Sequence, residues 1–187
     1  MTRSNSRRQI LACLGGIVAT GLAEPATASL IAQDNWSSLR KPRTLAFDNL
    51  HTGEKASIDY WSSGRYLTDG LSEVNVILRD FRNGEIHDID PRLLDLLHQL
   101  HLDVDSKAPF EVISGYRSPA TNAKLRSEGH GAASKSYHMK GMAIDIRLAD
   151  VELRHLHEAA LARKVGGVGY YPESNFVHVD VGPVRRW

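Results

Sequence analysis

The residues best suited to chemistry lie in the stretch from Ser136 to Asp145, where His138 and the carboxylate of Asp145 stand seven positions apart. Gly141 lies between them, and a turn there lets the chain double back so that both side chains reach one point. After the turn, Ala143 and Asp145 alternate with apolar residues at Met142, Ile144 and Ile146. This period of two predicts a strand with one apolar face and with Asp145 on the other face.

A second short run, residues 176–181, also alternates, with valines on one face and His178 and Asp180 on the other. If this strand lies beside the first, His178 joins His138 and Asp145. Two imidazoles and one carboxylate suit a zinc ion (Zn²⁺) that keeps an open coordination position. Such an ion polarises a carbonyl group and lowers the pKa of bound water, which is the chemistry of amide hydrolysis. The alternative is that His138 and His178 are unrelated core histidines, and spacing alone does not decide between these interpretations.

The composition is that of an ordinary globular protein. The chain has 187 residues, of which 42% are hydrophobic and 24% charged, enough for one domain with its own core. A formal net charge of +1 gives no reason to expect a nucleic-acid partner. No segment after the N-terminal region is long and apolar enough to span a membrane.

Residues 1–28 have the layout of an export signal, with a twin-arginine pattern at Arg7-Arg8, an apolar run over residues 10–22 and an A-x-A site ending at Ala28. A membrane anchor is disfavoured because the run is short and glycine-rich, and a lipoprotein because Cys13 lies at the start of that run. We therefore expect export to the periplasm or cell envelope. Cleavage would remove Cys13, the only cysteine, which excludes disulfides and cysteine catalysis in the mature protein.

Residues 29–43 are predicted to be a linker and residues 44–187 the folded domain. Strand composition occurs at residues 44–50, 56–61, 110–114, 142–146, 168–171 and 176–181. Helical patterns cover residues 69–83, 91–102, 119–126 and 150–164, with Asp90, Ser118 and Asp150 as expected caps of the last three. This order predicts an α+β fold with an antiparallel sheet and helices packed on one side.

Three other histidines are weaker candidates for metal ligands. His98 and His101 lie three positions apart on the predicted helix 91–102, a spacing that suits a metal. Their leucine-rich context favours a surface or interface role, because no acidic partner or further ligand lies nearby in sequence. His51 lacks partners and is interpreted as a turn residue.

Three motifs together resemble the zinc D-Ala-D-Ala peptidase superfamily, which shares its fold with hedgehog signalling domains. They are Ser114-Gly-Tyr-Arg117-Ser118, Ser136-x-His138-x-x-Gly141-x-Ala143-x-Asp145 and Phe176-x-His178-x-Asp180. More narrowly, the chain is similar to the murein endopeptidase K branch, whose members are exported enzymes that cut peptidoglycan crosslinks. The likeness covers residues 44–187.

The resemblance implies roles for particular residues. His138, Asp145 and His178 are the implied zinc ligands, while Tyr116, Arg117 and Ser136 are the implied substrate-binding residues. The planar guanidinium of Arg117 suits a peptide carboxylate or a polarised carbonyl oxygen. The alternative for Arg117 is a structural ion pair.

The general base is the point where the chain departs from the superfamily pattern. Many members carry a His or Glu two or three positions before the last ligand, where this chain has Phe176 and Asn175. Asp180 is the first candidate, either as the base or as a carboxylate that supports His178. His130 and Glu173 are the second and third candidates.

The resemblance thus implies a zinc-dependent murein endopeptidase that acts on peptidoglycan. Two alternatives remain open from the sequence: a carboxypeptidase that trims stem peptides, and a non-catalytic hedgehog-like module that binds wall peptides. Whether D,D or L,D bonds are cut depends on the shape of the cleft, and the sequence does not specify it.

Overall fold

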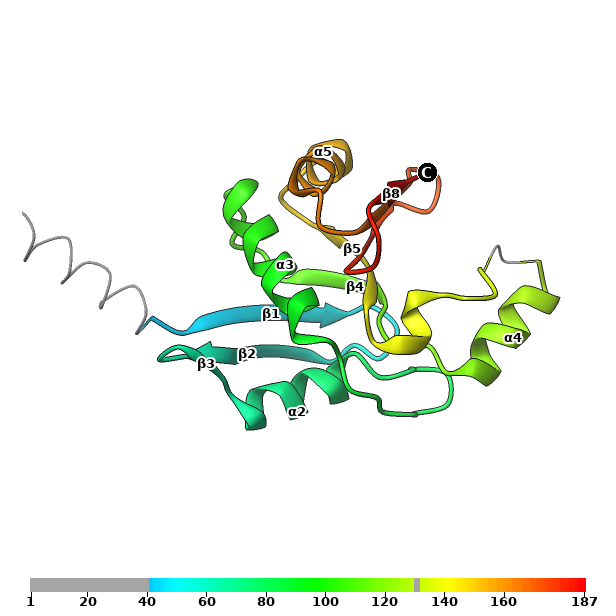
Figure 1. Ribbon diagram of the computed structural model, residues 1–187, viewed down its shortest axis with the longest axis horizontal. Coiled ribbons are helices and arrows are strands. Elements are labelled where there is room, and N and C mark those ends of the chain that lie inside the picture. Colours follow the sequence, from blue (N-terminus) through cyan, green and yellow to red (C-terminus); the bar gives the residue numbers. More distant parts are fainter. Residues whose placement is uncertain (1–40, 130–131) are drawn as a thin grey trace, which may run out of the picture.

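An eight-stranded sheet forms the frame of the computed structural model, which describes residues 41–129 and 132–187 (Figure 1). The strands are β1 (Arg43–Asn49), β2 (Lys55–Ser62), β3 (Arg65–Tyr66), β4 (Phe110–Ser114), β5 (Ala143–Leu148), β6 (Gly167–Tyr171), β7 (Phe176–Asp180) and β8 (Arg185–Arg186). Their order across the sheet is β3-β2-β1-β4-β5-β7-β6-β8.

Most neighbouring strands are antiparallel, but β1–β4 and β6–β8 are parallel. The first parallel pair arises because β2, β3 and two helices intervene between β1 and β4, which provides the crossover that a parallel pair needs. The predicted α+β fold is confirmed. The two parallel pairings, and the two-residue strands β3 and β8, are features that the sequence did not predict.

Four α-helices accompany the sheet: α2 (Thr68–Ile77), α3 (Pro91–Asp103), α4 (Pro119–Ser127) and α5 (Leu153–Arg163). Helix α2 contacts β2, α3 contacts β1, and α5 contacts β5, β6 and β7. Figure 1 shows α4 set apart from these, beyond the end of the sheet. A 3₁₀ turn, η1 (Tyr137–Lys140), precedes β5.

The alternation along the central strands separates core from site. Ile144 and Ile146 of β5 and Val177 and Val179 of β7 are buried in the hydrophobic core, together with Leu156 of α5. Because successive side chains in a strand point to opposite faces, the residues between them lie on the other face of the sheet. The packing of the apolar face therefore determines which polar residues face away from the helices.

The first helix is shorter than predicted, because it ends at Ile77 rather than near Asn83. A tight turn follows, in which the Asp80 side chain accepts a hydrogen bond from Arg82 N (3.1 Å) and Gly84 N donates to Asp80 O (2.7 Å). A second oxygen of Asp80 accepts from Ser118 N (3.0 Å). The side chain of Asp80 thus stabilises the turn instead of a further helical turn.

Two of the predicted helix caps are confirmed and one is wrong. Asp90 accepts from Arg92 N (2.9 Å), and Ser118 Oγ accepts from Thr121 N (3.2 Å). Asp150 does not cap α5, which begins at Leu153 after Glu152. The Asp150 carboxylate instead accepts a hydrogen bond from Ser106 Oγ (2.7 Å), a contact with the segment between α3 and β4 that no local pattern reveals.

The predicted export signal and nearly all of the predicted linker lie outside the described residues. Within residues 41–129 and 132–187, none of the helices has the length and apolar character needed to cross a bilayer.

Gly141 gives a test of how tightly η1 is held. Its φ is +62°, and a Cβ there would overlap with the backbone carbonyl of Asp88. Gly64 has a φ of +82° with open space around it. We expect Gly64→Ala to lower the free energy of unfolding by about 1–2 kcal/mol through backbone strain alone. Gly141→Ala should cost about 1–3 kcal/mol more, because the clash is added to the strain. Equal decreases in the free energy of unfolding of the two variants, measured by urea denaturation, would contradict this account.

Candidate metal centre

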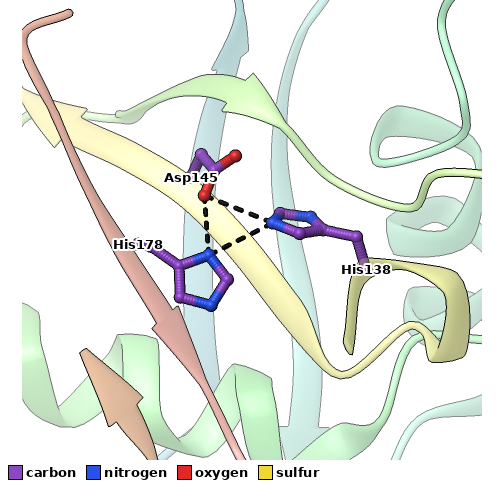
Figure 2. A group of neighbouring side chains, drawn as sticks. All are labelled: His138, Asp145 and His178. Carbon is purple, nitrogen blue, oxygen red and sulfur yellow. Dashed lines mark hydrogen bonds and ion pairs between the residues drawn. The ribbon is translucent and has the colours of Figure 1, made fainter. Parts of the chain in front are cut away.

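Three side chains from separate segments converge on one point (Figure 2). Asp145 Oδ1 lies 2.8 Å from His178 Nδ1 and 3.2 Å from His138 Nε2, and the two imidazole nitrogens are 3.2 Å apart. All three residues are buried. In the part of the chain that the structure describes, this is the single group of His, Cys, Asp and Glu side chains arranged to hold a metal ion.

Local structure explains how each side chain arrives there. Asp145 of β5 and His178 of β7 are directly opposite each other in the antiparallel ladder, so their side chains leave the same face of the sheet. His138 comes from η1, where Ser136 Oγ accepts a hydrogen bond from His138 N (3.3 Å). The left-handed Gly141 ends η1 and turns the chain into β5. The predicted turn and strand are therefore both present.

Hydrogen bonds on the outer side of each imidazole determine which nitrogen is free. His138 Nδ1 donates to the carbonyl of Gly115 (2.7 Å), since a carbonyl can only accept. His178 Nε2 donates to Asp180 Oδ2 (3.0 Å). The remaining nitrogens, His138 Nε2 and His178 Nδ1, face each other and Asp145. This is the arrangement in which a histidine ligand is held by a second hydrogen bond.

The donor set fits a metal ion. Tetrahedral coordination with metal–nitrogen distances of about 2.0–2.1 Å separates neighbouring ligand atoms by roughly 3.3 Å. The three observed separations of 2.8, 3.2 and 3.2 Å are close to that value. Two nitrogens and one carboxylate oxygen are ligands that zinc accepts, and three protein ligands leave a fourth position open.

The electrostatics favour a cation at this point. Burial alone would raise the pKa of the Asp145 carboxyl, but the imidazoles of His138 and His178 outweigh burial and hold that pKa well below its usual range. Burial would lower the pKa of His178, yet hydrogen bonds to Asp145 and Asp180 raise it above its ordinary value. The buried cluster therefore stabilises positive charge among its members.

Asp180 lies on the far side of His178 from the cluster and is fully buried. Its carboxylate accepts hydrogen bonds from His178, from both terminal nitrogens of Arg185 (3.1 and 2.5 Å) and from the backbone N–H groups of Gly167 and Gly182. Burial opposes ionisation, but these bonds lower the pKa of Asp180 to about 2. The Asp180 carboxylate therefore stays ionised as a hydrogen-bond acceptor, and no free lone pair on it is directed at the pocket.

The other two candidates for the base differ in what the structure shows. Glu173 lies in the turn between β6 and β7 and is not among the residues that line the pocket at the cluster. His130 lies outside the described residues. Asp145 is the single carboxylate among the described residues that line this pocket.

A pocket of about 430 Å³ opens onto the cluster. Three cationic and four aromatic side chains line the pocket. The cations are Arg117, Lys135 and Arg185, and the aromatic residues are Tyr137, Tyr171, Phe176 and Trp187. Ser136 also lines the pocket, as the sequence predicted for a substrate-binding residue, although its hydroxyl also caps η1.

Arg117 is placed beside the cluster. Its Nη2 lies 3.6 Å from Asp145 Oδ2 and donates to Ser114 Oγ (3.3 Å). Its Nε is buried without a hydrogen-bond partner among the described residues. Burial lowers the pKa of the Arg117 guanidinium, and Asp145 opposes that shift. Because Arg117 lines the pocket, its guanidinium can bind an oxygen atom of a ligand there.

Tyr116 is placed elsewhere, although the sequence motif put it with Arg117. Its ring is buried and stacks on His87, with centroids 4.6 Å apart, and its hydroxyl donates to Glu85 Oε1 (2.7 Å). It does not line the pocket. The neighbouring residues of an extended segment point in opposite directions, so only one of the pair can face the cluster.

The sequence did not single out four of the pocket residues: Lys135, Tyr171, Arg185 and Trp187. Tyr171 could have been found, because the period of two along residues 168–171 places it on the same face as Gly169, which pairs with His178. Arg185 and Trp187 reach the pocket through the short strand β8, which has no pattern of its own. His98 and His101 are remote from the cluster, and His101 stacks on Phe110 (centroids 4.1 Å apart).

Comparison with known proteins agrees with this geometry. The family model described as "Peptidoglycan L,D-endopeptidase MepK" matches residues 37–187. The chain belongs to this family. It is 41% identical over 189 residues to peptidoglycan L,D-endopeptidase MepK of Escherichia coli strain K12, with 100% of both chains covered. It is 42% identical over 151 residues to the probable MepK of Haemophilus influenzae, covering 80% of this chain and 81% of that protein.

Among solved structures, the L-Ala D-Glu endopeptidase ChiX of Serratia marcescens matches 51% of this chain and 72% of that one, at 20% identity and a TM-score of 0.33. Membership of the MepK family confirms the resemblance predicted from the motifs. It makes the chain a peptidase that acts on peptidoglycan, and an endopeptidase rather than a carboxypeptidase or a non-catalytic module.

The position of Tyr116 can be tested against a substrate-binding role. Tyr116→Phe should lower the free energy of unfolding by about 1–2 kcal/mol, because it removes a hydrogen bond to a carboxylate. In a double-mutant cycle with Glu85→Ala, the double variant should lose little more stability than the more destabilised of the two single variants. A substrate-binding residue would behave differently, with unchanged stability and a raised KM.

Proposed function

We propose that this protein is a zinc-dependent L,D-endopeptidase of the cell envelope, which hydrolyses an amide bond in peptidoglycan crosslinks. The bond type is supported by the family description and by the names of both relatives. Zinc is supported by the donor set. The observation that carries the proposal is the convergence of His138 Nε2, Asp145 Oδ1 and His178 Nδ1 at the base of an open pocket.

The residues of this chain have separable tasks in such a reaction. His138, Asp145 and His178 would hold the zinc ion, which when bound polarises the scissile carbonyl and lowers the pKa of a water molecule. Gly115 O and Asp180 orient the two imidazoles through their outer nitrogens. Arg117 lines the pocket beside Asp145, and its guanidinium would bind a substrate oxygen.

The charge of the pocket supports an anionic peptide as substrate. Arg117, Lys135 and Arg185 line it, while its single described carboxylate, Asp145, is engaged by both imidazoles. Free carboxylates of a wall peptide would meet this surface favourably. The aromatic residues offer flat apolar area against which a peptide backbone can lie.

Asp180 is proposed as a positioning residue rather than the general base. A carboxylate that already accepts five hydrogen bonds, with its pKa lowered to about 2, is a poor proton acceptor. It is well suited to hold His178 in the tautomer that leaves Nδ1 free.

Export is part of the proposal, because the substrate of the family lies in the cell wall. The twin-arginine route remains a prediction about residues 1–28. In a variant with both Arg7 and Arg8 replaced by lysine, the amounts of protein in the periplasmic and cytoplasmic fractions would test the export route. This variant leaves the described domain unchanged.

The metal requirement has a direct test. The purified protein should contain about one zinc ion per chain, and chelation should abolish cleavage of defined L,D-crosslinked muropeptides. His138→Ala should lose the metal and the activity together. His155→Ala, on the exposed face of α5, is the matched control and should change neither. Chelator-resistant cleavage would overturn the proposal, as would wild-type protein that binds zinc but cuts no crosslink.

Asp180→Asn distinguishes positioning from base catalysis. We expect zinc affinity, measured by competition with a chelator, to fall by about 10–100-fold, because His178 loses its charged partner. Glu173→Gln is the matched control and should leave the affinity unchanged. Unaltered zinc affinity combined with lost turnover would instead assign Asp180 the role of base.

A further inference from the structure

Tyr171 lies at the edge of the cluster, and the hydrogen of its hydroxyl group has no acceptor among the described residues. It is the last residue of β6, where Gly169 pairs with His178 and Tyr171 pairs with Phe176 of β7. The period of two places Tyr171 on the same face of the sheet as His178. Its side chain lines the pocket, and the residue is 37% exposed. It is therefore open to a ligand that reaches the cluster.

The hydroxyl of Tyr171 is oriented by Trp187. Trp187 Nε1 lies 2.6 Å from Tyr171 Oη. An indole N–H can only donate, so the phenol oxygen is the acceptor and its own hydrogen points elsewhere. Among the residues that the structure describes, no acceptor receives that hydrogen. The Tyr171 hydroxyl is thus a donor without a protein partner inside the pocket.

The neighbours of Tyr171 hold the ring in place. Phe176 stacks on it with centroids 4.5 Å apart. The Trp187 indole lies against Gly169, where a Cβ would come within 2.7 Å of it, and its ring centroid is 5.2 Å from that of His178. Gly169 thus leaves the space in which the indole covers His178 and reaches Tyr171. A side chain held in this way needs little rearrangement to donate to a ligand.

The location of Tyr171 relative to Arg117 suggests which ligand atom it meets. Arg117 and Tyr171 both line the pocket that opens onto the cluster, and Arg117 Nη2 lies 3.6 Å from Asp145 Oδ2. A guanidinium and a hydroxyl with a free hydrogen, both beside the candidate metal centre, can together stabilise one oxygen atom in which negative charge develops.

We propose that Tyr171 is a further catalytic residue, whose hydroxyl donates a hydrogen bond to the oxygen of the scissile carbonyl as that oxygen becomes negatively charged. This inference rests on the proposed function. The hydrogen stays on Tyr171 throughout, so the step adds charge stabilisation and transfers no proton.

Tyr171→Phe tests the inference, because it removes the hydroxyl and keeps the ring that Phe176 stacks on. We expect kcat on an L,D-crosslinked muropeptide to fall about 100-fold, with KM, zinc content and melting temperature unchanged. Tyr170→Phe is the matched control, since Tyr170 is on the opposite face of β6 and stacks on His157. It should leave kcat unchanged. Trp187→Phe, which loses the orienting N–H donor together with part of the ring that lies against His178, should give a smaller fall in kcat.

The outcomes separate this inference from the proposed function. Wild-type cleavage that is sensitive to chelators, together with full kcat in Tyr171→Phe, would overturn the role of Tyr171 and leave the proposed function standing. A rise in KM alone, or loss of zinc from the variant, would also overturn it, because either result indicates ground-state binding or a structural role. A wild-type protein without zinc-dependent cleavage would remove both.

Discussion

The pairing of β5 with β7 is the constraint on which the rest of the structure depends. It places Asp145 directly opposite His178, with the apolar neighbours of both residues in the hydrophobic core. A shift of one residue would exchange the two faces and bury the carboxylate and imidazole among valines and isoleucines. The burial of the apolar face against α5 therefore determines the register, and the register brings two of the three residues of the cluster together.

Around this pair, both imidazoles of the cluster are held from outside by hydrogen bonds. Gly115 O and Asp180 each accept a hydrogen bond from one imidazole, and Arg185 and two backbone N–H groups in turn satisfy Asp180. An unpaired buried charge would lower the stability of the fold. The outer hydrogen bonds reduce the free-energy cost of burying these charged groups together. The same layer orients the lone pairs toward one point. The same contacts therefore stabilise the fold and position the site residues.

The predictions from sequence were most accurate where a local pattern carried the information. The alternation in β5 and β7, the Gly141 turn and the caps at Asp90 and Ser118 all follow from contacts within a few residues. The errors arose where distant contacts prevailed. Asp150 bonds to Ser106 instead of capping α5, and Asp80 stabilises a turn joined to Ser118 where a longer helix was predicted.

The sequence by itself determined the types of the cluster residues, the strand faces of Asp145 and His178 and, through three motifs, the family. The tertiary structure decided which of these residues meet and what surrounds them. Strand pairing and loop closure bring together positions 33 and 40 residues apart, and β8 carries Arg185 and Trp187 to the pocket. A single sequence encodes such contacts only through the free energy of the whole packed domain, so no local period reveals them.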